Sequence, residues 1–132
     1  MDRLSNEDRA RRRIGEQFGI QLAKRKLVVG IKADGVQRLH EFDGVSPDGQ
    51  VVIEVKTNEL RATPGKPRGR YDSAIKQALA LDLYVLSRVN AKTKLLVLTD
   101  RPLFEVCSRD WDGLLAPDTQ IVYCSAEGPA EH

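Results

Sequence analysis

The sequence has no long hydrophobic run and contains few cysteines, histidines and aromatic residues. No stretch approaches the roughly twenty apolar residues of a membrane-spanning helix. The first residues, MDRLSNEDRARRR, lack the apolar region of a secretory signal. We therefore expect a cytoplasmic protein that does not engage a membrane. The two cysteines, Cys107 and Cys124, form no CxxC pair, which argues against a zinc site or a disulfide framework and favours two buried free thiols.

The composition is that of a soluble globular protein, with 132 residues, of which 41% are hydrophobic and 30% charged. This length predicts a single domain, residues 1–132. The net charge of +2 conceals an uneven distribution, because residues 1–26 and 58–99 each carry eight basic side chains, while residues 100–132 carry two basic and seven acidic ones. The distribution favours a basic surface built from two segments. Ordinary solvated surface is the alternative.

Hydrophobic periodicity and turn residues predict eight elements in the order α-β-β-β-α-β-α-β. A helix is expected over residues 6–24, because Ser5 can cap it and Ile14, Phe18 and Leu22 recur at four-residue spacing. Two Asp-Gly pairs indicate turns between three antiparallel strands. The expected segments are strands at 27–33, 36–45 and 50–57, a loop at 58–70, a helix at 71–89, a buried strand at 94–100, a helix from Pro102 and a strand at 120–124.

The second and third strands carry charges that a half-buried hairpin would not need. If Asp48-Gly49 forms a two-residue turn, Asp43 lies opposite Glu54. Strand alternation then puts two sets on opposite faces: Glu41, Asp43, Val45, Val52, Glu54 and Lys56 on one, and Phe42, Ile53 and Val55 on the other, with His40 also facing away from the acids.

Two carboxylates across a strand pair repel each other unless a cation lies between them. Oxygen ligands without histidine or thiolate suit Mg²⁺ or Mn²⁺ better than zinc. Lys56, on the same face, would orient or deprotonate the attacking water or neutralise charge on phosphorus. These residues predict phosphodiester hydrolysis. The alternative is a solvent-facing strand on which charges such as Glu41 and Lys56 merely pair.

The pattern of Asp43, ten further residues and then Glu54-Val55-Lys56 resembles the motif of the PD-(D/E)xK nuclease superfamily. The resemblance covers roughly residues 6–100. It implies an α/β fold with a three-layer, restriction-endonuclease-like core, α-β-β-β-α-β, around a mixed central sheet, to which the C-terminal helix and strand are an addition.

The resemblance implies a role for each matching residue. Asp43 and Glu54 correspond to the metal-binding carboxylates, the Val55 carbonyl to a further ligand and Lys56 to the catalytic lysine. Glu16 matches the first-helix acid that holds a second metal or its water, and Gln77 the assisting polar residue of the next helix. Two departures are Phe42, where proline is common, and Leu81, where the exonuclease-like branch has tyrosine. The second favours an endonuclease.

Basic residues expected to bind nucleic acid begin just past this motif and recur in the first helix: Arg61, Lys66, Arg68, Arg70, Lys76, Arg12 and Arg13. Such contacts to phosphates supply affinity but little sequence information. With three phenylalanines, three tyrosines and one tryptophan, we expect no stacking platform for single strands, so duplex or branched DNA is the favoured partner.

We therefore expect a small Mg²⁺- or Mn²⁺-dependent deoxyribonuclease, working as a homodimer or in a larger assembly that supplies targeting. Two alternatives remain open at this point. One is a nucleic-acid-binding or scaffolding domain of the same fold that does not cleave. The other is an α/β domain whose charged hairpin is ordinary surface and which recognises a protein partner.

Overall fold

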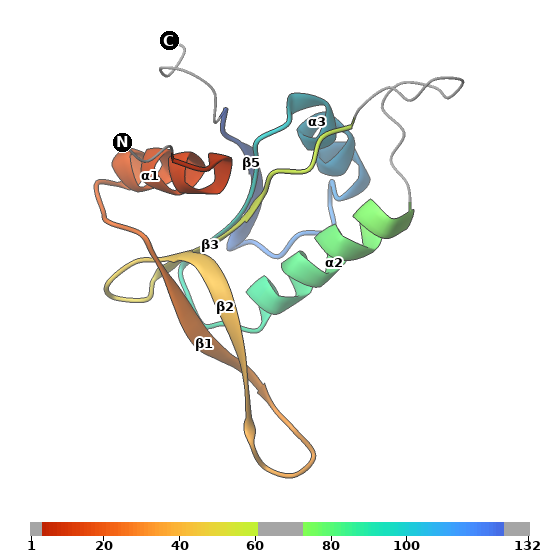
Figure 1. Ribbon diagram of the computed structural model, residues 1–132. Helices are drawn as coiled ribbons and strands as arrows, with labels where there is room; N and C mark the ends of the chain where they lie inside the picture. The colour runs from red at the N-terminus through yellow and green to blue at the C-terminus, as the bar shows by residue number, and fades with distance from the viewer. Residues whose placement is uncertain (1–3, 61–72, 126–132) are drawn as a thin grey trace.

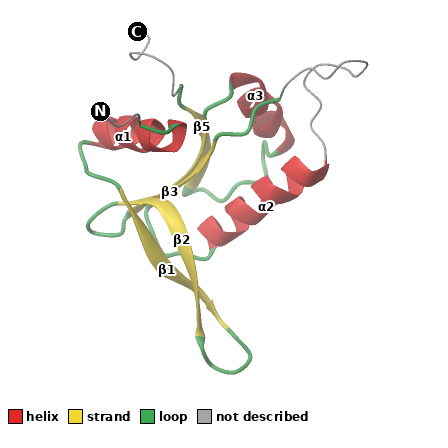
Figure 2. Cartoon of the chain, in the orientation of Figure 1, coloured by secondary structure: helices red, strands yellow, loops and turns green. Residues whose placement is uncertain are grey.

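The computed structural model describes residues 4–60 and 73–125, in which three helices accompany five strands (Figures 1 and 2). The element order α-β-β-β-α-β-α-β is confirmed. The elements are α1 (Asn6–Phe18), β1 (Ala23–Ile31), β2 (Gln37–Val45), β3 (Val51–Lys56), α2 (Ser73–Ser87), β4 (Thr93–Leu98), α3 (Arg101–Asp110) and β5 (Thr119–Tyr123). In the described part of the chain, no helix combines the length and apolarity needed to cross a membrane.

The five strands form one mixed sheet in the order β1-β2-β3-β4-β5. The first three strands are antiparallel neighbours, and β3, β4 and β5 run parallel. Side chains alternate between two buried clusters. Val52, Leu96 and Leu98 pack with residues of α2 and α3, while Ile53 and Val97 pack with residues of α1. Helices thus cover both faces of the sheet, an arrangement compatible with a three-layer α/β fold.

Helix α1 begins as expected but ends earlier. The Ser5 hydroxyl accepts a hydrogen bond from the Asp8 amide, which confirms the N-terminal cap. Gly19 then adopts a left-handed conformation, with φ of 68°, and ends the helix. The expected continuation to residue 24 is wrong because residues from Ala23 onward join β1. Phe18, expected on the buried face, is 44% exposed.

A β-bulge in β2 changes which side chains share a face. Arg25 pairs with Phe42 and Ala23 pairs with Val45, so two residues of β2, Asp43 and Gly44, lie opposite the single residue Lys24. Phe42 consequently joins the buried cluster on the α2 side, together with Val45 and Val52. The expectation that Phe42 faces away from Val52, with Ile53 and Val55, is therefore wrong.

The β2–β3 hairpin keeps the expected register but pairs over a shorter length. Ladder pairing is confined to Gly44 with Ile53 and Val45 with Val52. The Ser46 amide donates to the Val51 carbonyl, so the connection is the four-residue segment 47–50 rather than a two-residue turn. Beyond this short ladder β2 leaves β3 and continues with β1 as an arm that extends from the body (Figure 1).

Gly44 is a position where the bulge needs the absence of a side chain. A Cβ atom there would lie 2.8 Å from Ile53 Cγ1 and 3.2 Å from Leu22 Cβ. We expect Gly44→Ala to lower the free energy of unfolding by about 1–3 kcal/mol, because the buried neighbours must shift. Urea unfolding measures the change.

Gly30→Ala is the matched control, because Gly30 also lies in a strand and a Cβ there meets no atom within 4 Å. We expect its free energy of unfolding to stay within about 0.5 kcal/mol of the wild type. Equal losses in the two variants would contradict the close packing assigned to Gly44.

Candidate functional site

Asp43 and Glu54 meet where β2 separates from β3, and their carboxylates bond to each other's strand. The Val55 amide donates to Asp43 Oδ2 at 2.7 Å, and the Asp43 amide donates to Glu54 Oε1 at 3.3 Å. Each carboxylate thus accepts a hydrogen bond from a backbone amide of the other strand, just beyond the end of the ladder. Both carboxylates are drawn into one region, with Glu54 buried and Asp43 partly buried.

His40 belongs to this region, although strand alternation predicts that it faces away. Its Nε2 lies 3.2 Å from Glu54 Oε2, and its ring packs edge-on against Phe42. The bulge at Asp43 and Gly44 is the physical reason, because one extra residue reverses the alternation on its far side. An isolated glycine in a strand pattern is the sequence signal that could have predicted the bulge.

Asp82 of α2 is another residue that the sequence did not predict at the site. It lies in the buried stripe of α2 with Leu79, Leu83 and Leu86. Its Oδ2 atom lies 3.1 Å from Lys56 Nζ, although without the geometry of a good hydrogen bond. An acid inside the apolar run ALALDLYVL was the available signal, because a buried carboxylate requires a partner.

Three carboxylates with raised pKa values surround this point. Burial, followed by the negative charges of Asp43 and Asp82, raises the pKa of Glu54 to about 8. Burial also raises the pKa of Asp43, against the hydrogen bond from Val55, and that of Asp82, against its contact with Lys56. When all three carboxylates are ionised, they carry more negative charge than the Lys56 ammonium neutralises.

The Glu54 shift predicts how stability depends on pH when no metal is present. Between its usual pKa of 4.5 and about 8, the folded protein binds a proton at Glu54 that the unfolded chain has released. The free energy of unfolding must then fall as pH rises across this window, by at most about 1.4 kcal/mol per pH unit from this group. Thermal unfolding in EDTA from pH 5 to pH 8 measures the decline.

Glu54→Gln should flatten this decline and leave the variant more stable than the wild type near pH 8. Glu105→Gln, at an exposed position on α3, is the matched control and should follow the wild type. Parallel curves for wild type and Glu54→Gln would show that Glu54 titrates normally in the folded protein.

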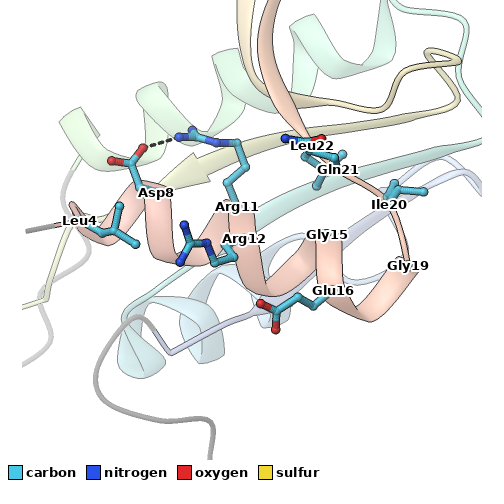
Figure 3. Close-up of a pocket in the computed structure, with 10 residues that line it drawn as sticks. All are labelled: Leu4, Asp8, Arg11, Arg12, Gly15, Glu16, Gly19, Ile20, Gln21 and Leu22. Atoms are coloured by element: carbon cyan, nitrogen blue, oxygen red, sulfur yellow. Dashed lines mark hydrogen bonds and ion pairs between the residues drawn. The ribbon is translucent and has the colours of Figure 1, made fainter.

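Of the acids on α1, Glu7 rather than Glu16 lies on the side of Asp43. Glu7 Oε2 is 3.1 Å from both Lys24 Nζ and Arg11 Nη1, and the same Arg11 nitrogen donates to the Asp43 carbonyl at 3.1 Å. Glu16, nine residues further on, is exposed and on the opposite side of the helix. In Figure 3 Glu16 and Arg11 project from different sides of α1.

The hollow drawn in Figure 3 does not coincide with the carboxylates. It measures about 620 Å³ and lies against α1, with Arg11, Arg12 and Glu16 in its wall. Asp43, Glu54 and Lys56 are not among its lining residues. We therefore base the candidate site on the charged cluster and not on this concavity.

The other residues expected at the site or on nucleic acid are placed as follows. Gln77 is exposed on α2, outside the buried stripe that presents Asp82. Arg12 and Lys76 are exposed, whereas Arg13 donates to the Ser125 carbonyl at 2.7 Å, beyond the end of β5. Four of the expected cations, Arg61, Lys66, Arg68 and Arg70, lie outside the described residues.

The donor set can be tested against a hard divalent cation. Among residues 4–60 and 73–125, no group of three or more histidine, cysteine, aspartate or glutamate side chains has a geometry that could hold a metal. Mg²⁺, however, is commonly bound through one or two carboxylates and otherwise by water. Asp43 and Glu54, whose pKa values burial raises, and the Val55 carbonyl nearby in sequence fit that kind of site.

Comparisons of the chain with protein-family models, with curated proteins and with solved structures gave no match. The geometry of this site is therefore the basis for assigning a function.

Proposed function

We propose that this chain is a small metal-dependent nuclease with a restriction-endonuclease-like core that hydrolyses phosphodiester bonds of DNA. The observation that carries the proposal is the meeting of Asp43 and Glu54 where β2 leaves β3, with Lys56 two residues beyond Glu54 and paired with Asp82, in a partly buried cluster rich in carboxylates. Carboxylates brought together at this cost to stability are typical of functional sites. The element order and the mixed sheet are compatible with such a core.

In this proposal each residue has a distinct task. Asp43 and Glu54 would hold Mg²⁺ or Mn²⁺, with the Val55 carbonyl as a further ligand. The bound cation would supply Lewis-acid polarisation of the phosphoryl group. The Lys56 ammonium would orient the attacking water and stabilise negative charge that develops on the phosphate. His40 contacts Glu54 and would fix the orientation of that carboxylate.

The proposed substrate is duplex or branched DNA cut internally. Arg12 and Lys76 are exposed cations of the described chain, and the sequence places four more between residues 61 and 70. Contacts of this kind bind the phosphate backbone with little sequence preference. A single site of this type cuts one strand, so cleavage of both strands would require a second copy of the chain.

The test is cleavage of supercoiled plasmid, linear duplex, single strand and a four-way junction with Mg²⁺, Mn²⁺ or EDTA. We expect metal-dependent cutting by the wild type. Lys56→Ala and Asp43→Asn should lower the rate by about a hundredfold or more, because each removes a group that acts on the reacting phosphate or its metal.

Lys92→Ala and Asp110→Asn are matched controls, since both residues are exposed and neither belongs to the charged cluster. They should cut at the wild-type rate. Cleavage that persists in EDTA, or that survives both Lys56→Ala and Asp43→Asn, would contradict the proposal.

The non-cleaving alternative is favoured by two observations. Lys56 is paired with Asp82, and the described residues provide no ready-made three-ligand metal group. A domain that only binds nucleic acid would show salt-dependent affinity for DNA, no cleavage of any of the four substrates and no loss of affinity in Asp43→Asn.

A further inference from the structure

The Lys56 ammonium lies on the face of β3 that α2 covers, and there it pairs with Asp82 rather than with Glu54. Glu54 and Lys56 are two residues apart in β3, so their side chains project from the same face. A lysine there has a nearer sequence neighbour in Glu54. In the structure Lys56 Nζ lies 3.1 Å from Asp82 Oδ2, whereas Glu54 contacts His40, the Asp43 amide and the Asp82 side chain.

The burial of Asp82 makes this pairing consequential. Asp82 is 6% exposed in the middle of α2, among the leucines of its buried stripe. A carboxylate in that environment needs an opposite charge. Lys56 is the only lysine or arginine within ion-pair distance of Asp82 among the described residues. The pair therefore fixes a flexible ammonium at a definite place beside the two metal-binding candidates.

The charges at the site show what the pairing of Lys56 with Asp82 achieves. Asp43, Glu54 and Asp82 bring three negative charges when ionised, and Lys56 brings one positive charge. If Asp82 were neutral, the Lys56 ammonium could swing to Glu54 and act there as the counter-ion. A divalent cation would then have to displace the lysine before it could bind.

We propose that Asp82 is a positioning residue that draws the Lys56 ammonium to α2 and so leaves Asp43 and Glu54 open to a divalent cation. This inference rests on the proposed function, because it presumes that these two carboxylates bind the metal. It differs from a direct ligand role for Asp82, in which the carboxylate itself would touch the cation.

A double-mutant cycle on Mn²⁺ affinity tests the proposal without relying on cleavage. Isothermal titration calorimetry on the full chain would compare the wild type, Asp82→Asn, Lys56→Gln and the double variant. We expect Asp82→Asn to weaken Mn²⁺ binding roughly ten- to hundredfold, the size typical of residues that support metal ligands. The double variant should return to within about threefold of the wild type, because no ammonium is left to compete.

The cycle separates three explanations. Strong non-additivity, with Lys56→Gln strengthening binding much less than Asp82→Asn weakens it, supports positioning. Additive effects, with Lys56→Gln strengthening binding about as much as Asp82→Asn weakens it, would mean that Asp82 acts through its general field, and a double variant as weak as Asp82→Asn would mean that Asp82 ligates the metal. Either of these results overturns the proposal.

Two further variants keep the test decisive. Asp82→Ser, which leaves room for a water molecule, carries the same expectation if Asp82→Asn does not fold. Asp43→Asn tests the premise. Mn²⁺ binding that is lost in Asp43→Asn but unchanged in Asp82→Asn overturns this inference alone, whereas a wild type that binds no Mn²⁺ overturns the proposed function with it.

Discussion

The hydrogen bond from the Val55 amide to the Asp43 carboxylate, with its counterpart from the Asp43 amide to Glu54, is the interaction on which the site and the sheet both depend. In a regular antiparallel ladder of this register the Val55 amide would donate to a carbonyl of β2. Here the Asp43 carboxylate takes that place, so β2 can leave β3 without stranding this buried amide. The point at which the strands separate is therefore also the point at which two acids are held together.

The bulge at Asp43 and Gly44 makes this separation possible and determines what surrounds the acids. Because two residues of β2 lie opposite one residue of β1, the side chains before the bulge change face. Phe42 enters the core under α2, and His40 follows it to Glu54. Gly44 fits against Ile53 only because it has no side chain. Core packing and site geometry thus follow from the same inserted residue.

The sequence was sufficient to predict the order of the elements and the register of the β2–β3 hairpin, because periodicity and turn residues are local signals, but the β1–β2 hairpin has the connection 33–35 instead of a two-residue Asp34-Gly35 turn. It did not predict the end of α1, since Phe18 and Leu22 continue the helical spacing past Gly19 although the chain turns there. It also missed Asp82, Glu7 and His40. Their places depend on how α2 and α1 pack on the sheet and on one bulge, which are tertiary features that a period of 2 or 3.6 residues does not encode.

The excess negative charge of these carboxylates can be offset in two ways, and the two compete. One is a proton on Glu54, whose pKa of about 8 means that the metal-free protein holds that proton at neutral pH. In the proposed function the other is a divalent cation, which would bind there only as the proton leaves, so that metal binding and proton release would be linked. A lysine ammonium at Glu54 would also offset this charge, and it would then block the divalent cation. In our proposal, the pairing of Lys56 with Asp82 keeps the ammonium away from Glu54 and leaves the proton as the group that a cation would replace.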